Sequence, residues 1–360
     1  MIEAYFKNIV PLFHRTQRFL DQRSWAWPWL LALVVVVAVM GSMFVGAYPM
    51  PLRRPLDILL DIILPFSWVD SPAWDLREIT VVTLIRPPRI MVAVFAGITL
   101  GMSGTALQGM YRNPLVGPDL IGVSSGAAFG GALAYKLALP TLGIVTLASI
   151  GGVGAMLCTL FLARIVGGKS DGLPLILAGF FVGAFFMACV GLILHIGGGY
   201  AGPNLVYWLL GTFRGADPTK AWTIILTTTA GGILLMALRW RLNLLSLGDL
   251  DAKSLGLDVG TLRWILILVV SIMVAVQVAV SGVVGWVGLI IPHCARMLVG
   301  PDHRRLMPVS ALLGCLLVLG LDNLTRTVIW SEIPVGVLSG FLGTPFICFL
   351  FWKCRSRGWS

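Results

Sequence analysis

Residues Leu242–Gly260, with the sequence LNLLSLGDLDAKSLGLDVG, are the stretch from which the organisation of the chain can be worked out. This is the longest segment between apolar spans that carries charge and still keeps a folded pattern. Its charged residues are Asp249, Asp251, Lys253 and Asp258, and they alternate with the apolar residues Leu247, Leu250, Ala252 and Leu255. The glycines Gly248 and Gly256 lie on either side of its centre. The pattern predicts one or two short helices outside the membrane. We interpret the stretch as a docking surface through which the hydrophobic helices on either side are moved.

The composition around this stretch is that of a polytopic membrane protein. The chain has 360 residues, of which 58% are hydrophobic and 12% are charged, and its mean hydropathy is +0.91. A soluble domain could not bury that much apolar surface. Most of the 26 Lys and Arg residues fall in loops predicted to be cytoplasmic, so membrane topology explains the net charge of +10 and nucleic acid is not needed as a partner. The six cysteines are scattered without a CxxC pair, which favours core packing over disulfides or a metal site.

The apolar runs predict an all-α chain of about ten membrane spans with both termini in the cytoplasm. A basic N-terminal segment, 1–24, precedes a single transmembrane domain, 25–353, and a short cytoplasmic tail, 354–360. A loop at 49–85 is expected outside, with an amphipathic segment near 56–64, and a further short outside helix is expected at 204–213. The expected spans lie near 25–48, 86–110, 121–139, 142–166, 172–197, 219–238, 262–281, 284–298, 308–328 and 335–352.

Two segments combine proline and glycine in a way that breaks a helix at membrane depth. They are YRNPLVGPDLIGVSSGA, residues 111–127, and SGVVGWVGLIIPHCAR, residues 281–296. Broken backbone within a membrane must be buried in protein or line a cavity. One break follows an inward-running span and the other an outward-running span, so the two halves are candidates for inverted repeats, a common transporter plan.

Several long motifs, in order, resemble the FecCD family, the membrane permeases of ABC importers for iron–siderophores, haem, cobalamin and, in some members, molybdate. They are RPPR at 86–89, GMSGTALQGMYRNPLVGPDLIGVSSGA at 101–127, LSLGDLDAKSLGL at 245–257, SGVVGWVGLIIPHCARMLVGPDHR at 281–304 and EIPVGVLSGFLGTPFICFL at 332–350. The resemblance runs from about Trp25 to Lys353. It implies a bacterial inner-membrane complex of two permease subunits, two ATPase subunits and a periplasmic substrate-binding protein.

The resemblance also implies roles for individual residues. Contact with the ATPase is expected from Leu247, Gly248, Asp249, Ala252, Leu255 and Gly256, within coupling helices at about 242–260. Docking of the binding protein is expected from Arg86, Arg89 and Arg326, since arginine pairs specifically with carboxylates. Asp322, four residues before Arg326, is expected to hold that arginine in place. A cytoplasmic gate is expected at Ser170, Asp171, Gly172 and Leu173, although the small hydroxyl pair of cobalamin importers is not reproduced there.

Plainer interpretations stand beside these. Arg86 and Arg89 could anchor a helix end at lipid headgroups, and 247–256 could be a solvated loop. His195 and His293 are more typical of hydrogen-bonded structural residues than of ligands to a substrate or metal.

Other classes of function fit the sequence less well. No HExxH motif is present, and the GxSxG match GVSSG at 122–126 has no histidine at a persuasive spacing, so neither indicates a protease. Without a GxxxxGK[ST] loop, any ATPase must be a separate chain. An ion-coupled secondary transporter is the main alternative, but only Asp322 lies near the interior of a span, which favours an external energy source. The expectation is therefore a permease without catalytic residues, metal or cofactor, working as a homodimer on an iron chelate, haem or cobalamin.

Overall fold

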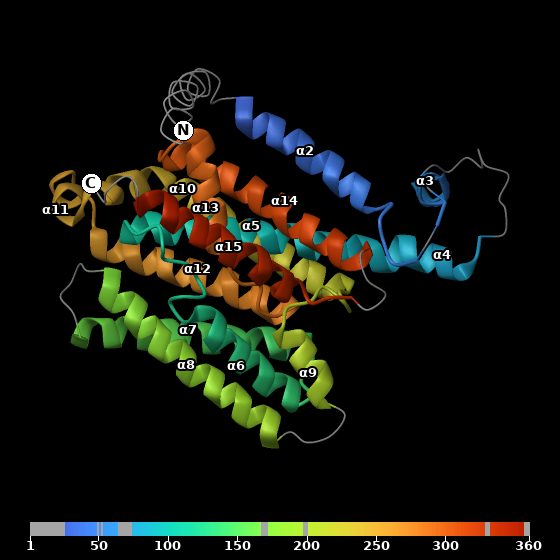
Figure 1. The fold of residues 1–360 in the computed structure, drawn as a ribbon, viewed down its shortest axis with the longest axis horizontal. Helices are drawn as coiled ribbons and strands as arrows, with labels where there is room; N and C mark the ends of the chain where they lie inside the picture. The colour runs from blue at the N-terminus through green and yellow to red at the C-terminus, as the bar shows by residue number, and fades with distance from the viewer. Residues whose placement is uncertain are drawn as a thin grey trace, which may run out of the picture.

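The computed structural model describes residues 26–48, 50–51, 53–63, 74–166, 172–196, 201–327 and 332–355. The predicted N-terminal segment, the gate residues Ser170 and Asp171, and the last five residues of the predicted tail lie outside these ranges. Within them every regular element is a helix, as predicted. Figure 1 shows long helices side by side, with short ones at the two ends of the longest axis.

The helices follow one another in the order α2 (Ala26–Ser42), α3 (Arg53–Ile63), α4 (Leu76–Thr80), η1 (Val81–Ile85), α5 (Arg86–Tyr111), α6 (Val123–Lys136), α7 (Thr141–Val166), α8 (Gly172–Ile196), α9 (Ala201–Leu209), α10 (Pro218–Leu247), α11 (Asp249–Ser254), α12 (Val259–Ser281), α13 (Val287–Val299), α14 (His303–Thr327) and α15 (Val335–Arg355). In the described part of the chain, six helical segments are long and apolar enough to span a membrane. Helices α2, α13 and α15 are apolar but shorter. Each of the ten predicted spans corresponds to a helix, although α6 and α13 are too short to cross a bilayer as straight spans.

Two predicted boundaries differ from the structure by about ten residues. The second span begins at Leu76 instead of Arg86, because α4, η1 and α5 form one continuous helix of 36 residues. Its prolines, Pro87 and Pro88, come directly after the wider π-helical turn η1, and this turn relieves the clash that proline makes inside a regular helix. The sixth span was predicted to end near 238, but α10 continues to Leu247. The stretch 242–260 therefore holds the end of a long helix and a single short helix, α11.

The packing of the helices is reciprocal between the two halves of the chain. Helix α5 packs on α13 and α14, and α12 packs in the same way on α6 and α7. Close approach of α5 and α14 depends on small residues: a Cβ added to Gly97 would lie 2.2 Å from the carbonyl oxygen of Gly314. This exchange of neighbours is what two intertwined repeats produce, and it supports the predicted repeat plan.

The two broken segments meet each other inside the bundle. The Asp119 carboxylate accepts a hydrogen bond from the backbone N–H of Trp286 at 3.2 Å and one from the Ser124 hydroxyl at 2.6 Å. Gln108, near the end of α5, donates to the carbonyl oxygen of Leu289 in α13 at 3.1 Å. Trp286 itself has a left-handed φ of 68°. The irregular backbone is thus satisfied within the protein, as its position among apolar helices requires.

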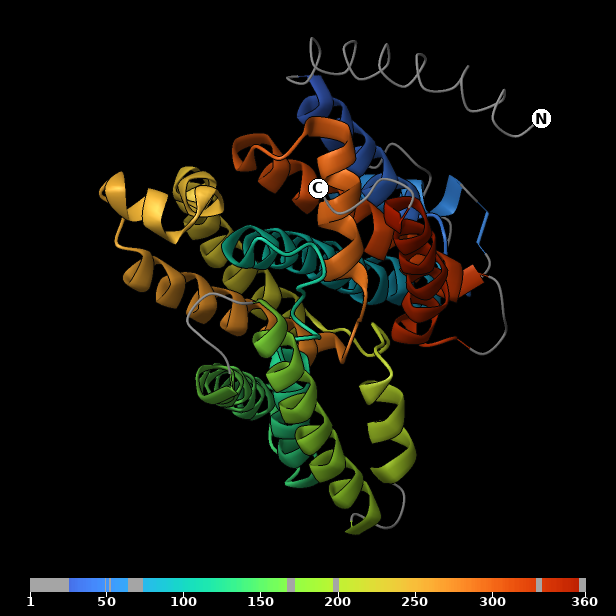
Figure 2. The ribbon, with the colours of Figure 1, turned by 60° about the vertical axis from the view of Figure 1, so that its left-hand side comes forward.

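The short helix α11 and the start of the α4–α5 helix lie at opposite ends of the molecule (Figure 1). Turning the molecule by 60° shows α8 and α9 as a layer set apart from α2, α14 and α15 (Figure 2). The predicted ATPase-contact residues and the predicted docking arginines therefore occupy opposite ends of the bundle.

Candidate functional site

Helix α11 is held between two glycines that adopt conformations other residues avoid. Gly248 has a φ of 127° and Gly256 a φ of 80°. They let the chain leave α10, make less than two turns of helix and turn back into α12. The next helix starts at a cap, where the Asp258 carboxylate accepts hydrogen bonds from the hydroxyl and backbone N–H of Thr261 at 2.6 and 3.1 Å. These bonds lower the pKa of Asp258.

Three leucines project from this element into its surroundings. Leu247 and Leu255 are each 58% exposed, and Leu250 is 82% exposed. Leu250 was not among the predicted contact residues, although its place between two aspartates in LGDLDAKS is a signal that it points away from the protein. Ala252 was among them, but it is buried and packs α11 onto the bundle. We call Leu247, Leu250 and Leu255 the leucine tip.

A salt bridge attaches α11 to the following long helix. Arg263 of α12 donates two hydrogen bonds to the Asp249 carboxylate, at 2.7 and 2.8 Å, in the paired geometry that gives such bonds directional strength. Both side chains keep about a quarter of their exposure, 22% for Arg263 and 26% for Asp249. Asp249 is thus an anchor of α11, and of the six predicted contact residues only Leu247, Leu255 and Gly256 are exposed.

At the opposite end, the structure brings together the three arginines that the sequence placed far apart. Arg86 and Arg89 lie on α5 and Arg326 on α14, and their exposures are only 3%, 8% and 5%. Arg89 donates from Nε to Asp322 at 2.9 Å and from Nη1 to both carboxylate oxygens of Glu332 at 3.0 and 3.1 Å. Glu332 was not singled out from the sequence, because its partner is 243 positions away in the chain. We call these five residues the arginine cluster.

The other two arginines of the cluster reach the segment after α2. Arg326 Nη1 donates to the carbonyl oxygen of Val45 at 3.0 Å, and its Nε lies 3.1 Å from Asp322, which confirms the predicted Asp322–Arg326 contact. Arg86 donates to the carbonyl oxygens of Met43 at 2.5 Å and Tyr48 at 3.2 Å. All three guanidinium groups are therefore bound inside the chain, and a partner reaches them only where an internal contact is given up.

Helix α8 starts at Gly172 and Leu173, two of the residues predicted to form the gate. It carries an exposed aromatic stripe, Phe180, Phe181 and Phe185, each more than 60% exposed. An apolar stripe of this size on a membrane helix faces lipid or a second chain.

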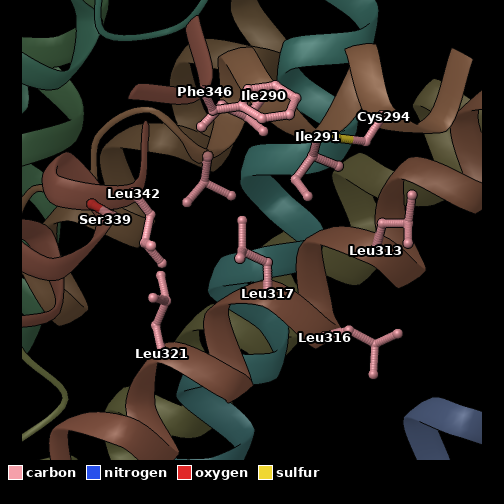
Figure 3. A pocket seen from close by; sticks show the side chains of 11 residues that line it. Ile290, Ile291, Cys294, Leu313, Leu316, Leu317, Leu321, Ser339, Leu342 and Phe346 are labelled. Atoms are coloured by element: carbon pink, nitrogen blue, oxygen red, sulfur yellow. The ribbon is translucent and has the colours of Figure 1, made fainter. Parts of the chain in front are cut away.

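An apolar cavity of about 530 Å³ lies beside α15, between it and its neighbours α13 and α14. Figure 3 shows side chains of α13, α14 and α15 around it, among them Ile290, Leu317 and Phe346. Apart from the Ser339 hydroxyl, which donates to the carbonyl oxygen of Gly336, the lining is hydrocarbon and sulfur. Among the described residues no group of three or more His, Cys, Asp or Glu is placed to hold a metal ion.

Comparison with known proteins gives consistent matches over nearly the whole chain. The sequence model of the FecCD transport family matches residues 33–353. The molybdate import system permease protein MolB of Haemophilus influenzae is 37% identical over 331 residues, covering 91% of this chain and 96% of MolB. The hemin transport system permease protein HmuU of Yersinia pestis is 34% identical over 338 residues, covering 91% and 95%. A solved inward-facing structure of a metal-chelate type ABC transporter superposes with a TM-score of 0.77 at 35% identity, covering 91% of this chain and 99% of that one.

Proposed function

Because the chain belongs to the FecCD transport family and is a permease of the ABC importer type, we propose that it carries a metal-containing solute across a bacterial inner membrane, driven by a separate ATPase. An iron–siderophore, haem or cobalamin is the proposed class of substrate. Molybdate is the second candidate, favoured by the similarity to MolB. The chain contributes no covalent chemistry in this proposal.

The observation that carries the proposal is the leucine tip on an anchored helix. Three exposed leucines, one on the six-residue helix α11 and one just before and one just after it, are costly in water, and they fit a partner's apolar cleft. The salt bridge between Asp249 and Arg263 joins this helix to α12, so a push on α11 is passed to a long helix of the bundle. A short, firmly attached helix of this kind could transmit the movement of an ATPase that closes on it to the membrane helices.

The remaining parts of the proposal follow the path of the solute. The arginine cluster receives a substrate-binding protein at the outer end, through arginine–carboxylate contacts. The phenylalanine stripe of α8 faces a second copy of the chain in a homodimer, with the gate at residues 170–173 on the cytoplasmic side. The cavity beside α15 gives that helix room to shift while the path opens and closes.

Substitution of Leu250 by Asp tests the coupling role directly. Leu250 is 82% exposed, so the change leaves the packing of the chain intact but puts a charge into the proposed apolar contact. We expect the co-purifying ATPase and the ATP-dependent uptake of labelled iron chelate, haem, cobalamin or molybdate to be lost together. Leu76→Asp makes the same change at a residue of similar exposure at the opposite end, and it should leave both intact.

Two outcomes would overturn the proposal. One is a fully coupled complex carrying Leu250→Asp. The other is full uptake by the purified chain alone in proteoliposomes with only an ion gradient, which would make the protein a secondary carrier.

A further inference from the structure

The arginine cluster is closed on its outer side by a carboxylate of the chain itself. The Glu332 side chain is 21% exposed, whereas the side chains of Arg89 and Asp322 are 9% and 0% exposed. Glu332 therefore lies between the solvent and the Arg89 guanidinium, and it covers Nη1 with both carboxylate oxygens.

The charges of the cluster do not balance. Three arginines face the two carboxylates Asp322 and Glu332, and Arg86 contacts only carbonyl oxygens within the described part of the chain. A buried cation without a counter-ion is costly, so the cluster favours one more negative group from outside. Carboxylates meet arginine in the paired geometry that Glu332 already shows.

We propose that Glu332 stands in for a carboxylate of an acidic protein partner, which replaces it on Arg89 when the partner docks. The inference rests on the docking role proposed above, and it adds a competitor within the chain. In the undocked state Glu332 stabilises the buried arginine. In the docked state the partner's carboxylate takes that place, and Glu332 turns to solvent.

The exchange is also expected to affect other helices, because the backbone of Glu332 is hydrogen-bonded to α9. The Tyr207 hydroxyl of α9 donates to the carbonyl oxygen of Glu332 at 2.8 Å. Three residues after Glu332 the chain enters α15, and a Cβ added to Gly336 would lie 2.3 Å from the carbonyl oxygen of Leu210, just after α9. A displacement of Glu332 thus acts at once on the start of α15 and the end of α9.

The test is the affinity of the purified binding protein that co-purifies with the tagged chain, measured on the complete ATPase-bound complex in nanodiscs. Glu332→Gln removes the competing charge and keeps the size of the side chain. We expect the Kd to fall about five-fold, the effect of one partly exposed charge pair. A residue with only a structural role would give unchanged or weaker binding when altered, so a gain in affinity is specific to competition.

A matched control separates competition from a general change of surface charge. Asp217→Asn also removes one negative charge at this end, and asparagine still caps α10. It should leave the Kd unchanged. If it tightens binding as much as Glu332→Gln does, long-range electrostatics explains the gain and the exchange is refuted. Tightening only in nanodiscs with anionic lipid would assign the cluster to a lipid headgroup and likewise overturn the proposal.

Arg89→Gln distinguishes this inference from the docking role on which it rests. Binding that weakens with Arg89→Gln but does not tighten with Glu332→Gln leaves docking in place and removes the exchange. Binding unaffected by either change removes both. Tyr207→Phe completes the set: the Kd should stay the same, while stimulation of ATP hydrolysis by the binding protein falls several-fold. Undiminished stimulation would contradict the link to α9.

Discussion

The salt bridge between Asp249 and Arg263 is the contact whose loss should separate ATP hydrolysis from transport. Substituting Arg263 by Met keeps an unbranched side-chain stem and removes both hydrogen bonds, at 2.7 and 2.8 Å. Fully exposed ion pairs contribute about 0.2–1 kcal/mol, and breaking a buried pair costs about 3–5 kcal/mol. With exposures of 22% and 26% this pair lies between the two, at about 1–2 kcal/mol.

A change of about 1.4 kcal/mol alters an equilibrium ten-fold. We therefore expect the equilibrium constant for holding α11 against α12 to fall by about that factor. The ATPase would still bind the leucine tip, but its movement would reach the bundle less often. The number of ATP molecules hydrolysed per solute transported should rise several-fold, with the KM for uptake unchanged.

Hydrolysis and uptake are measured on the same proteoliposomes, which also contain the ATPase and the binding protein. Lys220→Met serves as the control, because its pair with Asp217 is long, 3.9 Å, and lies at the opposite end. The charge swap Asp249→Arg with Arg263→Asp should recover part of the coupling. An unchanged ratio of hydrolysis to uptake in Arg263→Met, with the ATPase still bound, would refute this transmission of movement through α11.

Three further predictions concern stability, measured as the thermal midpoint, Tm, of the detergent-solubilised chain. Gly97→Ala puts a methyl group 2.2 Å from the Gly314 carbonyl oxygen and should lower stability by about 1–3 kcal/mol, whereas an unchanged Tm would contradict the close packing of α5 and α14. Thr228→Val removes the buried 2.6 Å hydrogen bond to Thr99 and should cost about 1 kcal/mol, with Thr99→Val in the same chain recovering part of it. Asp258 has a lowered pKa, so its charged cap stabilises the fold above the ordinary aspartate pKa, and this contribution is lost as the pH falls through the lowered pKa. The Tm deficit of Asp258→Asn at pH 7 should therefore shrink as the pH falls below about 4, and a deficit independent of pH would refute the charge effect.

The helices and the broken segments could be predicted because they depend on local composition. Long apolar runs, and prolines such as Pro114 and Pro118 within them, fix where a span exists and where it is interrupted. Boundaries were less predictable. The RPPR motif indicated a helix start at Arg86, but a π-helical turn lets the helix run through it, and that turn has no clear signal in the sequence VVTLI.

The sites could be predicted only in part, because their geometry depends on contacts distant in the sequence. The short helix near 249 was expected, but not that Ala252 faces inward or that Leu250 forms the outermost point of the leucine tip. The three arginines were expected at one surface. Their burial could not be predicted, because it results from contacts with Glu332 and with carbonyl groups after α2. These groups are far from the RPPR motif in the sequence, and no sequence pattern links them to it.

The contact between the two broken segments has a consequence for how the chain can be divided. Asp119 in the first half accepts a hydrogen bond from the N–H of Trp286 in the second half. Gln108, also in the first half, donates one to the carbonyl oxygen of Leu289. Each half thus supplies hydrogen-bond partners for the other. A fragment ending before α12 would lack these partners, so we expect neither half to fold on its own. If the two halves are repeats, as the sequence predicts, we expect them to insert and fold together.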